Sequence, residues 1–262
     1  MGILNVTPDS FSDGGAHLSA DEAADAARQM FADGALIVDV GGVSTRPGAG
    51  DVSEAEELRR VEPVLERLAG CRISIDTSRA EVARRAIALG ASMVNDVTAL
   101  EHDPELAAVV ANAGVELCLM HMQGEPRTMQ VAPRYDDVVS EVVAYLEGRL
   151  AAAVAAGIDE ACICLDPGIG FGKTADQNLE LVRGLDAIVR LGRPVLLGLS
   201  RKSTFARLYA RSDARVASDA ASVGAAVAAF ARGATLFRVH DVRSHVDALA
   251  VAAAVERGTV EA

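Results

Sequence analysis

Eight short apolar runs, each followed by a stretch of helix-forming residues, limit the possible folds of this chain more than any other feature. Most of these runs do not alternate between apolar and polar residues. Such runs indicate strands covered on both faces, as in a parallel sheet packed against helices. The expected strands are Gly2–Val6, Ala35–Val40, Arg72–Asp76, Ser92–Asp96, Glu116–His121, Cys162–Asp166, Pro194–Ser200 and Thr235–His240.

Glycines and capping residues mark where the intervening helices end and begin. A glycine just past a helix can take the left-handed conformation that satisfies the last helical carbonyls. A serine or threonine three positions before a glutamate or glutamine has the spacing of a capping box. Alanine-rich stretches such as Ala20–Ala32 and Ala151–Ala156 have high helix propensity. The glycines are Gly34, Gly70, Gly90, Gly114, Gly157, Gly192 and Gly233, and the expected boxes are Ser19 with Glu22, Ser53 with Glu56, Ser78 with Glu81 and Thr174 with Gln177.

Eight strands alternating with helices in 262 residues match the size and element order of a (β/α)8 TIM barrel, an α/β fold with a parallel eight-stranded sheet. An open doubly wound sheet has the same alternation, and composition alone does not separate the two. Eight units without a linker favour the barrel. No shift in composition marks a boundary, so we predict one domain over residues 1–262.

Composition argues against several classes of protein. The formal net charge is −12, whereas binding to nucleic acid needs a basic face; a local cluster of cations can still hold a small anion. No uncharged apolar run approaches the length of a membrane span, and strand-like residues follow Met1 at once, so we expect neither a membrane segment nor a secretion signal. The cysteines form no CxxC pattern and are expected to be buried reduced thiols, with Cys162 and Cys164 on one side of any strand that carries both.

Polar residues stand at the carboxyl ends of nearly all the expected strands. In a parallel barrel these ends share one mouth, where the active site lies. The abrupt change from "VLLGL" to Ser200, Arg201 and Lys202 therefore brings two cations to the mouth of an acidic protein. The strand-end residues are Asn5, Asp39, Asp76, Asn95, Asp96, His121, Asp166, Ser200, Arg201, Lys202, Arg238 and His240.

Two polar, turn-rich segments follow the first two strands and are interpreted as lids or binding loops. They are "NVTPDSFSDGG" (5–15) and "GGVSTRPGAG" (41–50), and both contain groups suited to anions. A third segment, "DPGIGFGKT" (166–174), is close to the phosphate-binding P-loop pattern. Pro167 stands where that pattern requires glycine and has no amide hydrogen to donate. We expect its glycines instead to let the backbone approach a flat ligand.

These segments together resemble the dihydropteroate synthase family of the folate pathway. The resemblance rests on "GILNVTPDSFSDGG", "DVGGVSTRPGA", "ISIDTS", "MVNDV", "CLMHMQGEPRTMQ", "LDPGIGFGKT", "LGLSRKS" and "RVHDV", in the family's order from Met1 to about Val242. It implies a cytoplasmic, dimeric (β/α)8 enzyme that joins p-aminobenzoate to 6-hydroxymethyl-7,8-dihydropterin pyrophosphate. Pyrophosphate leaves, with Mg²⁺ as the cofactor. The pathway is the target of sulfonamides, but the sequence does not predict sensitivity.

The resemblance also implies roles for individual residues. The pterin edge is bound by carboxylate and amide groups and by one ammonium, with apolar side chains against its ring. The leaving pyrophosphate is bound by an amide, an arginine and a histidine. A second aromatic pocket receives p-aminobenzoate. The implied pterin residues are Asp76, Asn95, Asp166 and Lys202, with Phe171 and either Met120 or Met122 against the ring. The implied pyrophosphate residues are Asn5, Arg238 and His240, with Asn5 also at Mg²⁺ and Asp9 stabilising both the cationic intermediate and the metal. Ser203, Phe11, Thr45, Arg46 and Pro47 belong to the p-aminobenzoate side, which Phe171 also lines, and Arg201 braces loops or phosphate.

Two departures from the family pattern leave alternatives open. Val43 stands where the family usually has glutamate, and the strand or hairpin that usually precedes the first barrel strand is not seen before Gly2. The alternatives are a pterin-dependent methyltransferase, a non-catalytic pterin-binding paralogue, and a P-loop NTPase that uses Lys173.

Overall fold

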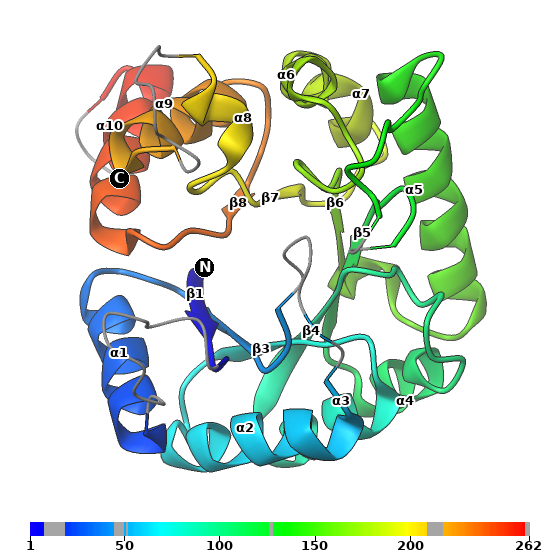
Figure 1. The fold of residues 1–262 in the computed structure, drawn as a ribbon. Helices are drawn as coiled ribbons and strands as arrows, with labels where there is room; N and C mark the ends of the chain where they lie inside the picture. Colours follow the sequence, from blue (N-terminus) through cyan, green and yellow to red (C-terminus); the bar gives the residue numbers. More distant parts are fainter. Residues whose placement is uncertain (8–18, 45–49, 51, 126–127, 209–216, 260–262) are drawn as a thin grey trace.

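The computed structural model closes the eight strands into a parallel barrel (Figure 1). It describes residues 1–7, 19–44, 50, 52–125, 128–208 and 217–259. Strands β1 to β6 pair in chain order, and β7 pairs with β8. Parallel bridges from Leu165 to Val195 and from Gly2 to Val239 join the two sheets at both ends. Because β1 is bonded to the far side of β8, the sheet has no free edge, and the predicted barrel is confirmed over the doubly wound alternative.

All strands except β4 are shorter than the apolar runs that predicted them, whereas β4 begins one residue earlier than its run. Their bounds are β1 (Gly2–Asn5), β2 (Val38–Gly41), β3 (Ile73–Asp76), β4 (Ala91–Asp96), β5 (Glu116–Met120), β6 (Ile163–Asp166), β7 (Leu196–Leu197) and β8 (Leu236–Phe237).

The helices surround the strands on the outside of the barrel, as Figure 1 shows. They are α1 (Ala20–Ala32), α2 (Glu54–Arg67), α3 (Ala80–Ala88), α4 (Leu106–Ala113), α5 (Val138–Ala155), the 3-10 turn η1 (Glu160–Cys162), α6 (Ala175–Arg183), α7 (Leu185–Val189), α8 (Ser203–Ala206), α9 (Asp219–Phe230) and α10 (Val242–Arg257). Within the described residues, no helix is both long and apolar enough to span a membrane.

The missing alternation in the strands has a simple cause, because both of their faces are buried. Val38 and Val40 belong to the large outer core beneath the helices, whereas Ile37 belongs to a small apolar plug inside the barrel. The plug consists of Ile37, Met93, Cys118, Cys164 and Leu196, with Met1 and Leu236 packed against it. All four cysteines are free thiols, as predicted, but the predicted burial holds only for Cys118 and Cys164. Cys162 is partly exposed and lies in η1, not beside Cys164 on a strand.

The polar site follows from this plug by the two-residue period of a strand. A residue two positions beyond a plug residue points to the same side of the strand. Going two residues toward the carboxyl end from Ile37, Met93, Cys164 and Leu236 gives Asp39, Asn95, Asp166 and Arg238. An apolar layer at the bottom of the barrel therefore becomes a polar layer at its mouth.

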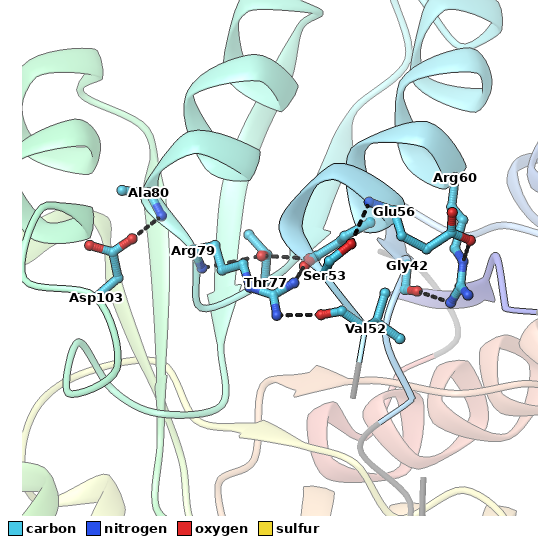
Figure 2. Close-up of polar contacts among 10 residues, drawn as sticks. Gly42, Val52, Ser53, Glu56, Arg60, Thr77, Arg79, Ala80 and Asp103 are labelled. Carbon is cyan, nitrogen blue, oxygen red and sulfur yellow. Dashed lines mark hydrogen bonds and ion pairs between the residues drawn. The ribbon is translucent and has the colours of Figure 1, made fainter. Parts of the chain in front are cut away.

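Local helix signals were mostly correct. All seven punctuating glycines have positive φ, and Ser19 and Thr174 form full capping boxes. Ser53 caps α2 through the amide of Glu56, but the Glu56 carboxylate pairs with arginines and does not complete the box. The predicted Ser78 cap is wrong. Helix α3 begins at Ala80, whose amide donates to Asp103 at 2.8 Å from a distant loop (Figure 2).

We expect Asp103→Ala to lower the free energy of unfolding by about 1 kcal/mol, because it leaves the first amide of α3 without its acceptor. Ser78→Ala is the matched control and should change that free energy by less than about 0.5 kcal/mol. Urea denaturation of both variants measures the difference. A larger loss in Ser78→Ala than in Asp103→Ala would contradict this assignment of the cap.

Candidate active site

Strand register places three predicted site residues on one level of the barrel mouth. Asn5 pairs with Gly41, Gly41 with Asp76, and Asp76 with Asn95. Register partners in parallel strands point to the same side. Gly41 has no side chain between Asn5 and Asp76, and a Cβ there would touch both. The mouth therefore presents two carboxamides and a carboxylate side by side.

A buried ion-pair network lies at the centre of this level. Arg238 donates from Nε to Asp39 Oδ2 at 2.6 Å and from Nη2 to Asp76 Oδ2 at 2.8 Å. Asn95 Nδ2 also donates to Asp39 Oδ2, at 3.0 Å. Asp39 is fully buried, and its other oxygen has no partner among the described residues. Asp39 thus orients both Asn95 and Arg238.

The sequence marks Asp39 only as a strand-end residue and predicts no role for it in the site. A charged residue in the middle of the apolar run "ALIVDV" was the available signal, because a buried charge needs a partner. That partner, Arg238, lies 199 residues away in sequence. No local pattern could therefore have identified it.

Burial changes the protonation of this network. It raises the pKa of Asp76 to about 7, an effect that the Arg238 charge opposes and the Asp39 charge increases. Burial alone would lower the pKa of Arg238, but the charges of Asp39 and Asp76 outweigh it and raise that pKa. The arginine stays charged while Asp76 is poised near neutrality.

A second group brings Asp166, Lys202 and Phe171 together from two loops. Asp166 ends β6 and accepts the Gly168 amide at 2.7 Å. Lys202 Nζ lies 4.4 Å from the centroid of the Phe171 ring, a cation–π contact. Burial raises the pKa of Asp166 to about 6, partly offset by its Gly168 bond and by Lys202. Burial also lowers the pKa of Lys202 to about 8, against the pull of Asp166.

The loop from Asp166 to Thr174 is not a phosphate cradle. Lys173 is 2% exposed and donates to carbonyls of its own loop, so it cannot reach a nucleotide, and the P-loop alternative is rejected. The expected role of the glycines is wrong at two positions. A Cβ at Gly168 would overlap the His121 carbonyl oxygen, and one at Gly172 would overlap that of Gln123. These glycines let the loop approach protein backbone.

The polar residues that follow β7 have different roles. The Ser200 hydroxyl lies 2.9 Å from His240 Nδ1, next to the mouth. Arg201 forms a two-pronged ion pair with Asp219 at the start of α9, as expected of a bracing residue. Ser203 is exposed at the first position of α8, which has four residues.

Two other strand-end residues serve the structure. Asp96 accepts the amides of Thr98 and Leu100 and so shapes the turn after β4. His121, which follows the last residue of β5, accepts a hydrogen bond from Lys173 through Nδ1. The strand-end pattern correctly located the mouth but did not separate these side chains from the ones that face it.

A cavity of about 580 Å³ opens beside Asp76 and contains Met122 in its lining, whereas Met120 is buried. A polar cluster, partly in the lining of this cavity and partly beside it, holds residues at both ends of the second loop (Figure 2). Arg79 pairs with buried Glu57 and donates to the Val52 carbonyl at 2.6 Å. Arg60 donates to the Gly42 carbonyl at 2.8 Å. Val43 lies in the same lining.

Five predicted residues lie outside the described part of the chain: Asp9, Phe11, Thr45, Arg46 and Pro47. Their roles stay predictions. Among the described residues, Asp76, Asn95 and Arg238 form one hydrogen-bonded network with Asp39, and Asn5 lies across Gly41 from Asp76. Asp166, Phe171 and Lys202 form a second group.

Comparison with known proteins identifies the family. Residues 1–240 match the family of pterin binding enzymes. Dihydropteroate synthase of Neisseria meningitidis serogroup C is 48% identical over 254 residues, which cover 95% of this chain and 89% of that protein. The chain belongs to the dihydropteroate synthase family.

Solved structures of the family agree with the fold. Dihydropteroate synthase of Yersinia pestis, in complex with a sulfonamide drug, has a TM-score of 0.92 and 42% identity, covering 98% of this chain and 93% of that one. Dihydropteroate synthase of Xanthomonas albilineans, in complex with 7,8-dihydropteroate, has a TM-score of 0.86 and 45% identity, covering 97% and 92%. The relatives are synthases across nearly the whole chain, so the methyltransferase alternative is not supported.

The two lysines of this family member allow its site to be measured directly. The chain contains two lysines, Lys173 and Lys202. We expect two lysine side-chain signals in a carbon-13-labelled sample, titrating near about 7 and about 8, because burial lowers the pKa of each. Lys202→Arg assigns them by removing one signal. Two signals that both titrate near the ordinary value of about 10.4 would show a mouth open to water.

Proposed function

We propose that this chain is a transferase that condenses p-aminobenzoate with 6-hydroxymethyl-7,8-dihydropterin pyrophosphate, giving 7,8-dihydropteroate and pyrophosphate. The observation that carries the proposal is the convergence of Asp76, Asn95, Asp166 and Lys202 on one barrel mouth. A relative at 45% identity has been solved with 7,8-dihydropteroate.

The chemistry of these side chains suits the pterin edge. An amino-pyrimidinone edge has neighbouring N–H donors and one carbonyl acceptor. A carboxylate accepts two N–H bonds, a carboxamide both donates and accepts, and an ammonium donates to the carbonyl. Asp166 has one oxygen occupied by the Gly168 amide and a second available for the pterin. Asn95 has one amide hydrogen directed to Asp39, which leaves its carbonyl oxygen and other hydrogen for the ligand.

The leaving pyrophosphate fits the side of the mouth formed by β1 and β8. Arg238 is held by two carboxylates through Nε and Nη2, and its Nη1 has no partner among the described residues. That nitrogen can donate to a phosphate oxygen without loss of the ion pairs. His240 lies two residues beyond Arg238, positioned by Ser200. Cations at this place stabilise negative charge as it develops on the departing group.

Mg²⁺ fits this site as a shared ligand of protein and substrate. Magnesium usually keeps several waters and shares its remaining ligands with substrate phosphates. The described residues contain no cluster of three or more acidic, histidine or cysteine side chains that could hold a metal alone. The side chain of Asn5 forms no hydrogen bond with another described residue and lies across Gly41 from Asp76. Its carboxamide oxygen is a suitable ligand, and the ion would neutralise pyrophosphate charge.

The reaction we propose is dissociative. The bond between the pterin methylene and the pyrophosphate oxygen breaks first, and the bonding electrons leave with pyrophosphate. The cation that remains is delocalised into the pterin. The p-aminobenzoate nitrogen then attacks the methylene and loses one proton. Arg238 and His240 stabilise the departing charge, and Asp9 is assigned to the cation on the family resemblance alone.

The p-aminobenzoate side is supported by fewer described residues. Phe171 offers a ring face beside Lys202, and Ser203 offers an exposed hydroxyl near the mouth. A four-residue helix adds little dipole, so the Ser203 hydroxyl and nearby amides would contact the carboxylate. A cytoplasmic homodimer, implied by the resemblance, stays a prediction.

Purified protein with Mg²⁺ should release pyrophosphate only when both substrates are present, and a sulfonamide should compete with p-aminobenzoate. A coupled pyrophosphate assay and mass detection of dihydropteroate measure this. Pterin binding without turnover would instead support the non-catalytic paralogue, for which Val43 is the only argument.

Asp166→Asn should weaken pterin binding by about 2–3 kcal/mol, because one acceptor is replaced by a misdirected amide donor. Burial raises the pKa of Asp166 to about 6, so the free energy of unfolding falls as the pH rises from the unfolded pKa of about 4 to about 6, and the full loss is present at pH 8. Its uncharged replacement should therefore not lower the free energy of unfolding at pH 8. Calorimetric titration with a pterin and urea denaturation measure the two effects. Unchanged pterin affinity would place this carboxylate away from the ligand.

The kcat/KM for the pterin substrate should rise with pH through about 6 to 7 and fall above about 8. The acid limb follows the raised pKa values of Asp166 and Asp76, whose carboxyl groups accept N–H bonds with both oxygens, and with a negative charge, only when ionised. The alkaline limb follows the lowered pKa of Lys202. Lys202→Arg should abolish the alkaline limb, whatever its effect on rate, because a guanidinium stays charged. A flat profile from pH 5.5 to 9 would contradict this assignment.

A further inference from the structure

The lysine of the glycine-rich loop is saturated by protein acceptors. Lys173 Nζ donates to the carbonyl oxygens of Gly168 and Phe171, both at 3.0 Å, and to that of His121 at 3.3 Å. Nδ1 of His121 lies 2.8 Å from the same nitrogen. An ammonium has three donors, so these four acceptors occupy it fully. Lys173 is 2% exposed and makes no contribution to the surface of the mouth.

The fourth acceptor is a neutral imidazole held in place by a tyrosine. Burial, followed by the charge of Lys173, lowers the pKa of His121 to about 3. Its Nδ1 is therefore unprotonated near neutral pH and accepts from the ammonium. The ring meets Tyr145 edge-on, with centroids 4.8 Å apart. One side of the ammonium site is thus rigid and belongs to β5 and its following loop.

The loop that Lys173 holds is attached to the β5 side along its length. Tyr135 donates its hydroxyl to the Gly172 carbonyl at 2.9 Å, and Gln130 donates to that of Gly170 at 2.5 Å. These contacts lie at the rim, where both side chains are partly or fully exposed. Lys173 is the buried member of the set and joins two points of the loop, Gly168 and Phe171, to His121.

Those two points control the groups that face the pterin. The Gly168 amide donates to Asp166 at 2.7 Å and so sets the carboxylate. The Phe171 ring lies 4.4 Å beneath the Lys202 ammonium. Loss of the Lys173 hydrogen bonds is therefore expected to displace Asp166 through Gly168, and Lys202 through Phe171.

The use of lysine at position 173 indicates that a compact ammonium is required there. Of 25 basic side chains, only Lys173 and Lys202 are lysines, and both lie in this assembly. All other basic side chains counted here are arginines. A planar five-donor fork cannot direct its hydrogens to four acceptors around one nitrogen, whereas a compact ammonium can.

We propose that Lys173 is a positioning residue for the pterin, which holds the Asp166–Thr174 loop so that Asp166 and Phe171 face the ligand correctly, without itself touching substrate. This inference rests on the proposed function, because it takes the pterin to bind at Asp166.

The test compares Lys173→Met with wild type. Methionine keeps much of the side-chain length and removes every donor. We expect the Kd for 6-hydroxymethyl-7,8-dihydropterin pyrophosphate, measured by calorimetry without p-aminobenzoate, to rise at least about tenfold, since small displacements of positioning groups have large effects. Lys173→Arg, which keeps the charge, should show the same rise.

Thr174→Ala is the matched control. It removes the capping box of α6 one residue away, so it should lower the melting temperature and leave the Kd within about twofold. Equal Kd values for wild type and a folded Lys173 variant would overturn the inference. So would a parallel rise in Kd in Thr174→Ala, because stability alone would then explain the effect.

Two further outcomes separate this inference from the proposed function. Wild-type binding without pyrophosphate release would reject the synthase reaction, while the Kd comparison would still decide the role of Lys173. If neither lysine variant folds, the wild type labelled at lysine decides. A nuclear Overhauser contact from the pterin to Lys202 and none to Lys173 supports positioning, and a contact to Lys173 overturns it.

Discussion

The buried carboxylate of Asp39 is the constraint on which the mouth of this barrel depends. Its Oδ2 accepts from Arg238 on the last strand and from Asn95 on the fourth, and Arg238 continues to Asp76 on the third. A buried charge that loses its partner is strongly destabilising, typically by about 3–5 kcal/mol. The ion pairs therefore fix the relative positions of strands that the backbone bonds alone would leave less defined. Among the described residues, Arg238 Nη1 and the carbonyl oxygen of Asn95 have no hydrogen-bond partner and remain available for ligands.

Burial supplies the chemistry of the site as well as its rigidity. It raises the pKa values of Asp76 and Asp166 and lowers that of Lys202, so that all three groups titrate between about 6 and 8. In water, the pKa values of the two aspartates and of the lysine would be about six units apart. Groups balanced in this way can match the donors and acceptors of a heterocycle with little net charge. The apolar plug beneath them keeps water out from below.

The sequence predicted what local patterns encode, and it missed what distant contacts decide. Glycines, caps and apolar runs correctly predicted the strands, most helix boundaries and the barrel. The strand-end rule led to Asp76, Asn95, Asp166 and Arg238. The rule could not show that Asp39 bonds to these residues, because its partner Arg238 is far away in sequence. It also could not show that the side chains of Asp96 and His121 contact loops. The cap of α3 was misassigned to Ser78 for the same reason, since Asp103 comes from another loop. Family resemblance, and not geometry, supplied the roles of Asp9, Phe11, Thr45, Arg46 and Pro47.

A crystal structure of this chain with 6-hydroxymethyl-7,8-dihydropterin pyrophosphate and Mg²⁺ tests the central claim most directly. We expect the pterin edge within hydrogen-bonding distance of Asp166, Asn95 and Lys202, and the diphosphate beside Asn5, Arg238 and His240, with the Asp39–Arg238 pair intact. A pterin seated elsewhere, such as in the cavity lined by Arg79 and Glu57, with the Asp39 network unoccupied, would contradict it.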